Sequence, residues 1–189
     1  MTGSTRTAIL DSAERAARAR GFDGFSYAVL SQEVGIRKAS IHYHFPTKAA
    51  LASALIARYH DEMARTCRQI DLKCETGGSR VHAMLNVYRV ALNDGQSLCL
   101  CVALSVSRES LPDDLPESLA AFRAMVIDWL AAAFSSSQTD GSIANVQDVQ
   151  AEAAAALALL EGAQLAARAT ENVAQFDTAV ALLRARLSA

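Results

Sequence analysis

Residues 26–55, SYAVLSQEVGIRKASIHYHFPTKAALASAL, contain the strongest structural signals in this chain. Ser26 can cap a helix that runs to Val34, because its hydroxyl can accept a hydrogen bond from a free backbone N–H of the first turn. Gly35 ends that helix, and a second short helix is expected over about Lys38–His44. Two short helices separated by so few residues are typical of a helix-turn-helix rather than of a long antiparallel pair.

Helices are also expected on both sides of this segment. The first runs over about Thr5–Arg20 and ends at Gly21. Pro46 stops the helix before it, and Thr47 can cap a longer helix whose apolar spacing fades near Asp71. Beyond a break at Gly77–Gly78, helices are expected near residues 79–93, 97–109, 115–134, 145–171 and 174–188, with a flexible loop at 135–142, SSSQTDGS. The chain is therefore predicted to be all-α, with about nine helices.

The composition excludes several classes of protein. The apolar stretches are interrupted before the ~20 residues that a bilayer crossing needs, and no apolar secretory segment opens the chain, so a cytoplasmic protein without a membrane partner is expected. Cys67, Cys74, Cys99 and Cys101 form neither a CxxC pair nor a zinc-ribbon spacing, which predicts reduced thiols and no metal. No nucleophile has a base at a recognisable spacing, so neither an enzyme nor a cofactor is expected.

Charge is distributed unevenly along the chain. Residues 1–70 hold ten Lys and Arg against six Asp and Glu, whereas residues 71–189 hold eight against fourteen. A basic N-terminal part suits a protein that presents one end to a polyanion, although ordinary solvated faces also produce such a split.

The second short helix has the side chains that DNA reading requires. A helix that enters the major groove presents small and polar side chains outward and buries its opposite face. The outward set is Lys38, Ala39, Ser40, His42, Tyr43 and His44. Ile41 and Phe45 supply the buried side. His42 and His44 are not expected to bind a metal, because i, i+2 spacing places them on different faces of the helix.

This segment resembles the TetR/AcrR family of transcription regulators, whose signature joins a capped helix, a glycine turn, an aromatic-His-Phe cluster and a lysine opening the next helix. The resemblance covers about the first 60 residues. It implies a helix-turn-helix DNA-binding domain over residues 1–47 and a ligand-binding and dimerisation domain over residues 48–189.

The resemblance also implies roles for individual residues. Lys38, Ala39 and Ser40 would approach base edges, while Tyr43 and His44 would contact bases or phosphates. Ser26 and Lys48 would contact backbone phosphates. The family commonly has Ser or Thr where this chain has Arg37, so the usual cap is missing, and Arg37 can instead reach a phosphate or a guanine.

For the C-terminal part, the resemblance implies that the last two helices pair with those of a second copy as a four-helix bundle. Their small and apolar side chains agree with close helix packing, but such stripes are equally typical of an internal core. The residues expected at the homodimer interface are Leu157, Leu160, Gln164, Leu165, Phe176, Val180, Leu183 and Leu187.

The family holds its effector in a cavity lined by the middle helices. The candidate lining residues are Met63, Cys67, Met84, Tyr88, Cys101, Phe122, Met125 and Trp129, each of which also fits a plain core. Residues 98–112, LCLCVALSVSRESLP, resemble a subset of the family in which cysteines sense electrophiles or oxidants. Buried, inert thiols are the alternative.

The predicted function is that of a TetR-type regulator, with repression as the expected role. It would bind palindromic double-stranded operator DNA as a homodimer and be released by a small-molecule or thiol-reactive effector that shifts the population between two dimer shapes. The alternatives are a scaffold of the same fold without DNA binding and an all-α enzyme.

Overall fold

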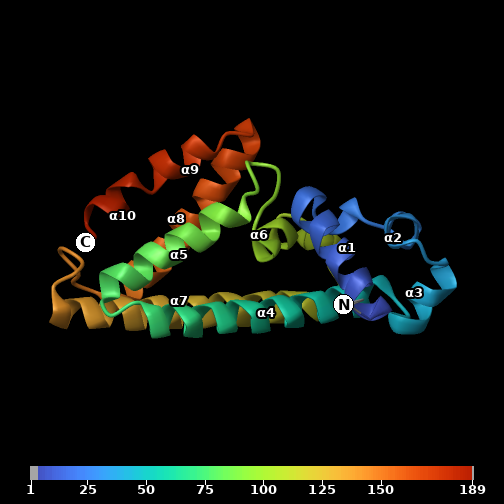
Figure 1. The fold of residues 1–189 in the computed structure, drawn as a ribbon, viewed down its shortest axis with the longest axis horizontal. Coiled ribbons are helices and arrows are strands. Elements are labelled where there is room, and N and C mark those ends of the chain that lie inside the picture. Colours follow the sequence, from blue (N-terminus) through green and yellow to red (C-terminus); the bar gives the residue numbers. More distant parts are fainter. Residues whose placement is uncertain (1–3, 189) are drawn as a thin grey trace. The chain divides into compact units, whose positions relative to one another are not determined.

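The computed structural model describes residues 4–188, which form ten α-helices and two 3-10 helices without a β-strand (Figure 1). The chain divides into two compact units. Unit 1 contains the chain up to Asp61 together with Leu100–Ala121, and unit 2 contains Glu62–Cys99 and the chain from Phe122 onward. The unit boundary therefore falls inside a helix. The functional division proposed after residue 47 is a different boundary and stays a prediction.

The all-α prediction is confirmed, and the first four helices lie within a few residues of their expected positions. The α-helices are α1 Thr5–Arg20, α2 Tyr27–Val34, α3 Lys38–His44, α4 Lys48–Lys73, α5 Gly77–Ala91, α6 Leu100–Ser105, α7 Leu115–Asp140, α8 Val149–Thr170, α9 Val173–Ala179 and α10 Ala181–Ala185. The 3-10 helices are η1 Phe22–Gly24 and η2 Arg108–Ser110.

Unit 1 is organised around α1, which packs on α2, α3 and α6. Ile9 and Ala13 of α1 are buried with Leu30 of α2 and Ile41 of α3, as the apolar spacing of each helix requires. The guanidinium of Arg58 forms ion pairs of 2.6 Å with Asp11 and of 2.6 Å with Glu14. These pairs attach the first part of α4 to α1.

Unit 2 has its core where α5 packs on α8 and α9. Gln164 is fully buried there. Its side-chain oxygen accepts a hydrogen bond of 2.8 Å from the backbone N–H of Cys99, and its side-chain nitrogen donates one of 2.7 Å to the carbonyl of Tyr88. Since a buried amide without partners would cost about 1–3 kcal/mol, these bonds specify how α8 and α5 are placed in this unit.

The prediction of a flexible loop at residues 135–142 was wrong, because α7 continues to Asp140. Ser137 is buried, and its hydroxyl donates a hydrogen bond of 2.6 Å to the carbonyl of Phe134. Serine is unfavourable in helix interiors mainly because its hydroxyl competes for backbone hydrogen-bonding groups. Here the Ser137 hydroxyl makes its hydrogen bond to a carbonyl of the same helix. Packing thus overrides the local preference.

The break expected at Gly77–Gly78 lies slightly earlier, at residues 74–76, because the two glycines form the first turn of α5. Thr76 caps the helix and exchanges hydrogen bonds with Ser79 in a capping box. A Cβ on Gly77 would lie 2.2 Å from the carbonyl oxygen of Ala133. The two glycines therefore permit a close approach to neighbouring backbone rather than a turn.

The C-terminal helix predicted over 174–188 is divided at Val180 into α9 and α10, and the helix predicted over 97–109 is shorter, Leu100–Ser105. At Val180 the backbone adopts φ −87° and ψ 0°, a tight-turn geometry. Neither glycine nor proline marks this position, so the pattern of residues provides no signal for the division.

α7 is also long and apolar enough, by length and composition alone, to cross a membrane, with a mean hydropathy of 1.3 over its most apolar window. The segment of α7 that belongs to unit 2 has four fully buried core residues at four-residue spacing, Phe122, Val126, Leu130 and Phe134. The packing of unit 2 accounts for this apolar face.

Candidate nucleic-acid interface

The turn between α2 and α3 is held by local hydrogen bonds. The Ser26 hydroxyl accepts from the Val29 N–H at 3.4 Å, which caps α2 as expected. Gly35 ends α2 in the left-handed conformation, with φ +73°, which glycine adopts without steric cost. The Ser31 hydroxyl then donates a 2.7 Å hydrogen bond to the Ile36 carbonyl. These contacts fix the angle at which α3 leaves the turn.

One face of α3 is buried and the other is open. Ile41 and the following Phe45 are buried in unit 1. Of the predicted contact residues, Ser26, Arg37, Lys38, Ala39, His42 and Tyr43 are exposed, while Ser40 and His44 are partly exposed. The predicted outward set is therefore exposed or partly exposed, and its contact with DNA stays a prediction at this point.

Tyr43 is the most exposed large side chain on this surface, at 84%. Its ring contacts only the edge of the His44 ring among the aromatic contacts of the described residues, with centroids 5.2 Å apart. An aromatic side chain left in water loses the favourable burial that such a ring normally provides. The exposed ring is therefore available for contact with a partner.

Cations on this surface are available for a polyanion. Arg37 precedes α3 with no side-chain cap, as its sequence predicts, and Lys38 opens the helix. Neither residue forms an ion pair with another residue between 4 and 188. Unpaired cations at the N-terminal end of an outward helix are suited to phosphate or guanine contacts.

His42 has a structural role that the sequence does not reveal. Its ring lies edge-on against Tyr27, with centroids 4.7 Å apart, and its Nδ1 is 3.3 Å from the Pro46 carbonyl. The Tyr27 hydroxyl donates a 2.8 Å hydrogen bond to the Phe45 carbonyl, and partial burial raises the pKa of Tyr27. His42 therefore packs α2 against the end of α3, and its side chain is also exposed.

Lys48 is also more constrained than its sequence position indicates. Its ammonium lies over two aromatic rings, 4.2 Å from the centroid of Phe22 and 4.6 Å from that of Phe25. Partial burial lowers the pKa of Lys48, against an opposing contribution from Asp23. The two rings hold the charge in place through cation–π contacts, which are worth about 0.5–1 kcal/mol at an exposed site.

The residues expected at the homodimer interface are mostly inside the chain's own core. Leu157, Leu160, Gln164, Phe176, Val180 and Leu183 are buried in unit 2, and Leu187 is partly exposed. Only Leu165, at 41% exposure, is open. Side chains already buried within one copy cannot add exposed area to an interface, so any interface on these helices uses their opposite faces.

The candidate lining residues of the effector cavity are likewise closely packed. Met63, Cys67, Met84, Tyr88 and Phe122 are buried in unit 2, whereas Cys101 is buried in unit 1. Met125 is partly exposed, and the indole N–H of Trp129 donates to both carboxylate oxygens of Asp71 at 3.1 Å. An effector cavity at these residues stays a prediction.

Comparisons with known proteins agree with this geometry. The sequence profile of the family described as "Bacterial regulatory proteins, tetR family" matches residues 9–55, which include α2 and α3. A protein of Pseudomonas putida described as "Probable HTH-type transcriptional regulator ArpR" is 26% identical over 164 residues, corresponding to 84% of this chain and 77% of that protein.

Solved structures are similar over nearly the whole chain. A TetR-family transcriptional regulator from Agrobacterium tumefaciens is 28% identical, with 98% of each chain covered and a TM-score of 0.92. Regulatory protein TetR from Rhodobacter sphaeroides is 19% identical, with a TM-score of 0.90 over 98% of this chain and 100% of that one. At the lower identity, the likeness concerns the fold alone.

Proposed function

The chain belongs to the TetR family of bacterial regulatory proteins, and from that premise we propose that it is a repressor that binds palindromic operator DNA as a homodimer. The observation that carries the proposal is the open face of α3, where Tyr43 is 84% exposed and the helix begins with the exposed cations Arg37 and Lys38. In a two-fold dimer, one α3 from each copy would enter successive major grooves about 34–36 Å apart.

The proposal is tested by binding of the purified protein to the intergenic DNA beside its own gene. A repressor of this kind gives a palindromic footprint and an affinity that falls steeply between about 50 and 200 mM salt, because phosphate contacts release counterions. A scaffold that lacks DNA binding would leave every duplex free at low salt. We further propose that the protein acts in the cytoplasm and has no catalytic step, as is usual for regulators of this family.

Replacing Lys48 by methionine is expected to weaken DNA binding and its salt dependence while unit 1 stays folded. Methionine retains an apolar stem beside Phe22 and Phe25 and removes only the charge. If each copy loses one phosphate contact, the slope of log K against log salt becomes shallower by about two for a dimer. Anisotropy titrations of a labelled duplex measure this slope. An unchanged slope would assign Lys48 to packing alone.

For the homodimer, we propose an interface on the outward faces of α8 and α10 in place of the buried residues expected from sequence. The outward positions of α8 are small or apolar and recur at helical spacing: Ala151, Ala155, Ala158, Gly162, Leu165 and Ala169. On α10, Leu182 is 83% exposed beside a 210 Å³ groove that Ala155 and Leu159 also line. Small side chains allow the helices of a second copy to approach closely.

Leu182→Ala is expected to weaken the dimer about tenfold, because symmetry removes the apolar contact twice. Sedimentation equilibrium measures the dissociation constant. The matched control is Leu72→Ala, which truncates a leucine of 79% exposure at the end of α4 that does not line this groove. If the two variants have the same dimer dissociation constant, the interface lies elsewhere.

The effector would be a small molecule that alters the spacing of the two α3 helices. A thiol-reactive effector would have limited access to this chain. Cys67, Cys99 and Cys101 are buried, and burial raises the pKa of the Cys67 thiol to about 11 with a further contribution from Asp71. Cys74, which is partly exposed, is the accessible thiol among the described cysteines.

Iodoacetamide at about pH 7.5 is therefore expected to alkylate Cys74 first and to leave Cys67 unmodified in the folded protein. The raised pKa means that the Cys67 thiolate, the reactive form, is scarce until the pH approaches 11. Peptide mass spectrometry over time measures each site. Early modification of Cys67 would show that unit 2 opens readily, and the buried thiols would then be candidate sensors.

A further inference from the structure

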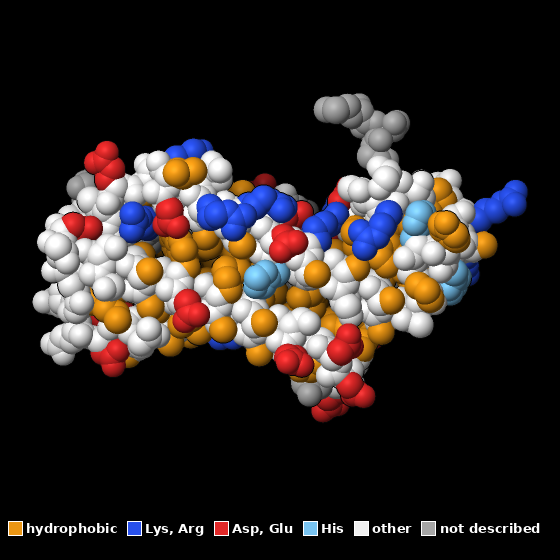
Figure 2. Space-filling model, turned by 90° about the horizontal axis from the view of Figure 1, so that it is seen from below, with side chains coloured by type: hydrophobic (Ala, Val, Ile, Leu, Met, Phe, Trp, Pro, Cys, Tyr) orange, Lys and Arg blue, Asp and Glu red, His pale blue; other side chains and the backbone are white. Residues whose placement is uncertain are grey.

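The cations of unit 1 differ in whether they have an acidic partner. Arg18 and Arg58 form ion pairs with Glu14, and Arg58 also pairs with Asp11. Figure 2 shows Lys or Arg and His side chains gathered over α2 and α3 on the face that it presents. The cations of this unit that form no ion pair within residues 4–188 are Arg6, Arg15, Arg20, Arg37, Lys38 and Lys48.

Two of these cations, Arg6 and Lys48, are held over aromatic rings at the turn between α3 and α4. The guanidinium carbon of Arg6 lies 5.1 Å from the ring centroid of Phe45, the buried residue that directly follows α3. Lys48, which begins α4, lies over Phe22 and Phe25. The first turn of α1 is close to this turn in Figure 1, in agreement with the ring contact. α1 therefore brings a cation to the end of α3 from outside the helix-turn-helix.

The contact with Phe45 leaves the hydrogen-bond donors of Arg6 available. A cation–π contact uses the attraction between the charge and the ring face, and it occupies none of the guanidinium N–H groups. Arg6 is exposed and has no carboxylate partner within residues 4–188. The ring also restricts a long side chain, so less conformational entropy is lost when the guanidinium binds an acceptor. Arg6 is thus a positioned donor that can bind an acceptor from outside the chain.

The dimensions of α3 place its C-terminal end near a DNA backbone. The 7 residues of α3 span about 10 Å, and the major groove that would receive this helix is about 12 Å wide. A recognition helix reads base edges with residues near its N-terminus, where α3 has Arg37 and Lys38. The other end of α3 and the turn that follows then lie near the phosphates that border the groove. Arg6 is held at that end.

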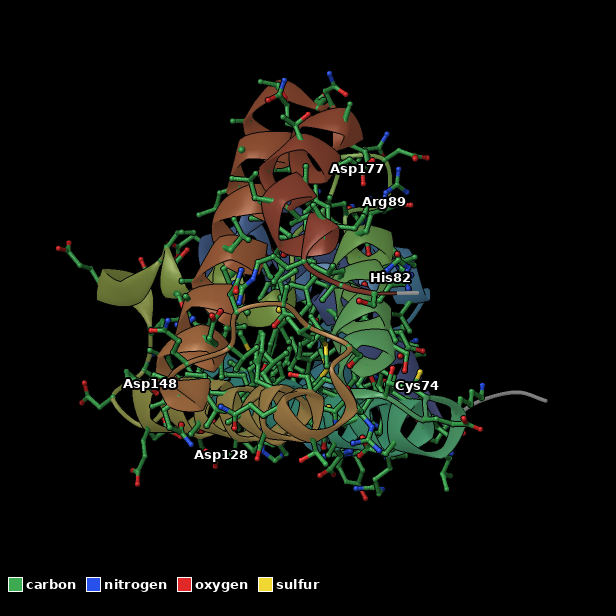
Figure 3. The ribbon with its side chains drawn as sticks, turned by 90° about the vertical axis from the view of Figure 1, so that its left-hand side faces the viewer. Cys74, His82, Arg89, Asp128, Asp148 and Asp177 are labelled. Carbon is green, nitrogen blue, oxygen red and sulfur yellow. The ribbon has the colours of Figure 1, made fainter. Side chains whose placement is uncertain are left out.

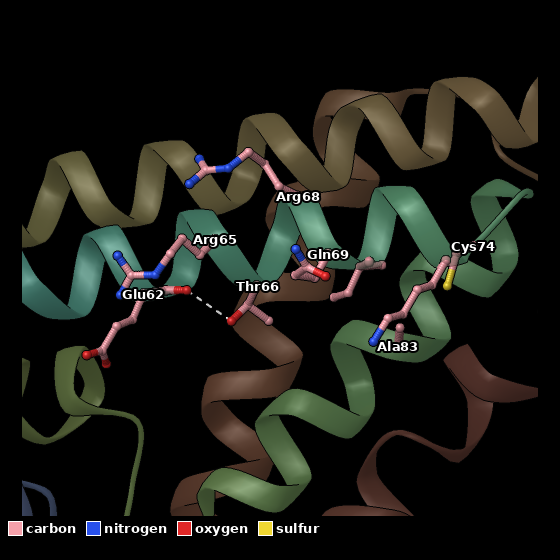
Figure 4. A pocket seen from close by; sticks show the side chains of 9 residues that line it. Glu62, Arg65, Thr66, Arg68, Gln69, Cys74 and Ala83 are labelled. Atoms are coloured by element: carbon pink, nitrogen blue, oxygen red, sulfur yellow. Dashed lines mark hydrogen bonds between the residues drawn. The ribbon is translucent and has the colours of Figure 1, made fainter. Parts of the chain in front are cut away.

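Unit 2 is less suited to a polyanion. Figure 3 shows its Arg89 and Asp177 pointing toward each other, and two hydrogen bonds of 2.8 Å join them. Arg65 and Arg68 of α4 belong to the lining of a pocket of about 650 Å³, but Figure 4 shows Arg68 on the side of that helix away from Ala83. The unit has eleven acidic residues against nine Lys and Arg, so a duplex would meet net repulsion there.

We propose that Arg6 contacts a backbone phosphate of the operator, so that the DNA interface includes α1 as well as the helix-turn-helix. This inference rests on the proposed function and adds a residue to its binding surface. Phe45 holds the guanidinium at the end of α3, and the guanidinium donates to phosphate oxygens in the bidentate geometry that arginine favours. Because phosphates carry no base identity, the contact strengthens binding to every duplex and positions α3 without selecting a sequence.

Arg6→Met tests the contact in anisotropy titrations of labelled operator and scrambled duplexes between about 50 and 200 mM salt. Methionine keeps an apolar contact with Phe45 and removes the charge. The variant is expected to bind both duplexes about tenfold more weakly, with a slope of log K against log salt that is shallower by about two. The reason is that a dimer loses one phosphate contact at each half-site. Arg6→Lys restores the charge and is expected to restore the slope.

Arg15→Met is the matched control. Arg15 is another exposed arginine of α1 without an ion pair among residues 4–188, and about two and a half helical turns place it on the opposite side of α1 from Arg6. This variant is expected to keep the slope of the unmodified protein. If Arg15→Met has the same effect as Arg6→Met, the loss comes from overall charge, and the proposed contact is refuted.

Ethylation interference locates the contact on the duplex. Ethylation of one phosphate per half-site, next to the bases that α3 protects, is expected to weaken the unmodified protein and Arg15→Met but not Arg6→Met. Identical interference patterns in all three proteins, with steep salt dependence retained, would assign Arg6 to packing on Phe45 and would leave the proposed function intact. If the unmodified protein binds no duplex at low salt, the proposed function fails and this inference fails with it.

Discussion

Replacing Gly77 by alanine is expected to lower the free energy of unfolding of unit 2 by about 3 kcal/mol. The new Cβ would lie 2.2 Å from the Ala133 carbonyl oxygen and 2.7 Å from the Ser137 backbone nitrogen. Both atoms belong to the backbone of α7, so they cannot move aside as the end of a flexible side chain would. The first turn of α5 must therefore separate from α7, with loss of packing between them.

Urea denaturation followed by circular dichroism measures this effect. Ala124→Gly is the control, because it changes an exposed position of α7 outside both the α5 contact and the proposed dimer face. Glycine at an exposed helix position costs about 0.5–1 kcal/mol relative to alanine, so the control variant should lose clearly less stability than Gly77→Ala. A Gly77→Ala protein as stable as the unmodified one would contradict the close approach of α5 and α7.

Tyr43→Ala is expected to weaken operator binding by about 30-fold while leaving stability and dimerisation unchanged. The ring is 84% exposed, so its removal sacrifices almost no packing in the free protein. A base or phosphate contact is worth about 1 kcal/mol or more, and a symmetric dimer loses it at both half-sites, or about 2 kcal/mol in total. Anisotropy titrations with a labelled operator measure the loss.

Two further variants make this result specific. Tyr43→Phe retains the ring and removes the hydroxyl, so it separates stacking or apolar contact from hydrogen bonding. Val90→Ala truncates an exposed apolar side chain of α5 in unit 2, which should not change operator affinity. If Tyr43→Ala binds like the unmodified protein, the open face of α3 is not the reading surface, and the proposed function fails with it.

Local signals were sufficient for the helix-turn-helix. Ser26 as a cap, Gly35 as the end of α2 and Ile41 on the buried side of α3 each depend on a few neighbouring residues, and the structure confirms all three. The outward position of Tyr43 follows from the same helical spacing. Such features depend on the backbone geometry of adjacent residues, which one sequence contains.

The loop predicted at residues 135–142 was wrong, and the break predicted at Gly77–Gly78 was placed a few residues too late, for a common reason. Serine and glycine are unfavourable in helices, and the packing of α5 against α7 overrides that preference. Gln164 illustrates the same limit, because its partners Cys99 and Tyr88 are 65 and 76 residues away in the chain. The residues near Gln164 in the sequence do not indicate that its side-chain amide finds hydrogen-bond partners inside the unit.

The order of the helices and the polar face of α3 were therefore contained in the amino-acid sequence, because caps, glycine conformations and helical spacing act between neighbours. Tertiary packing decided which apolar stripe faces inward and where the cations of α4 remain unpaired. It also decided how Lys48 lies over its two rings. Those arrangements arise from contacts between segments that are distant in the chain, and a single sequence does not specify which segments meet.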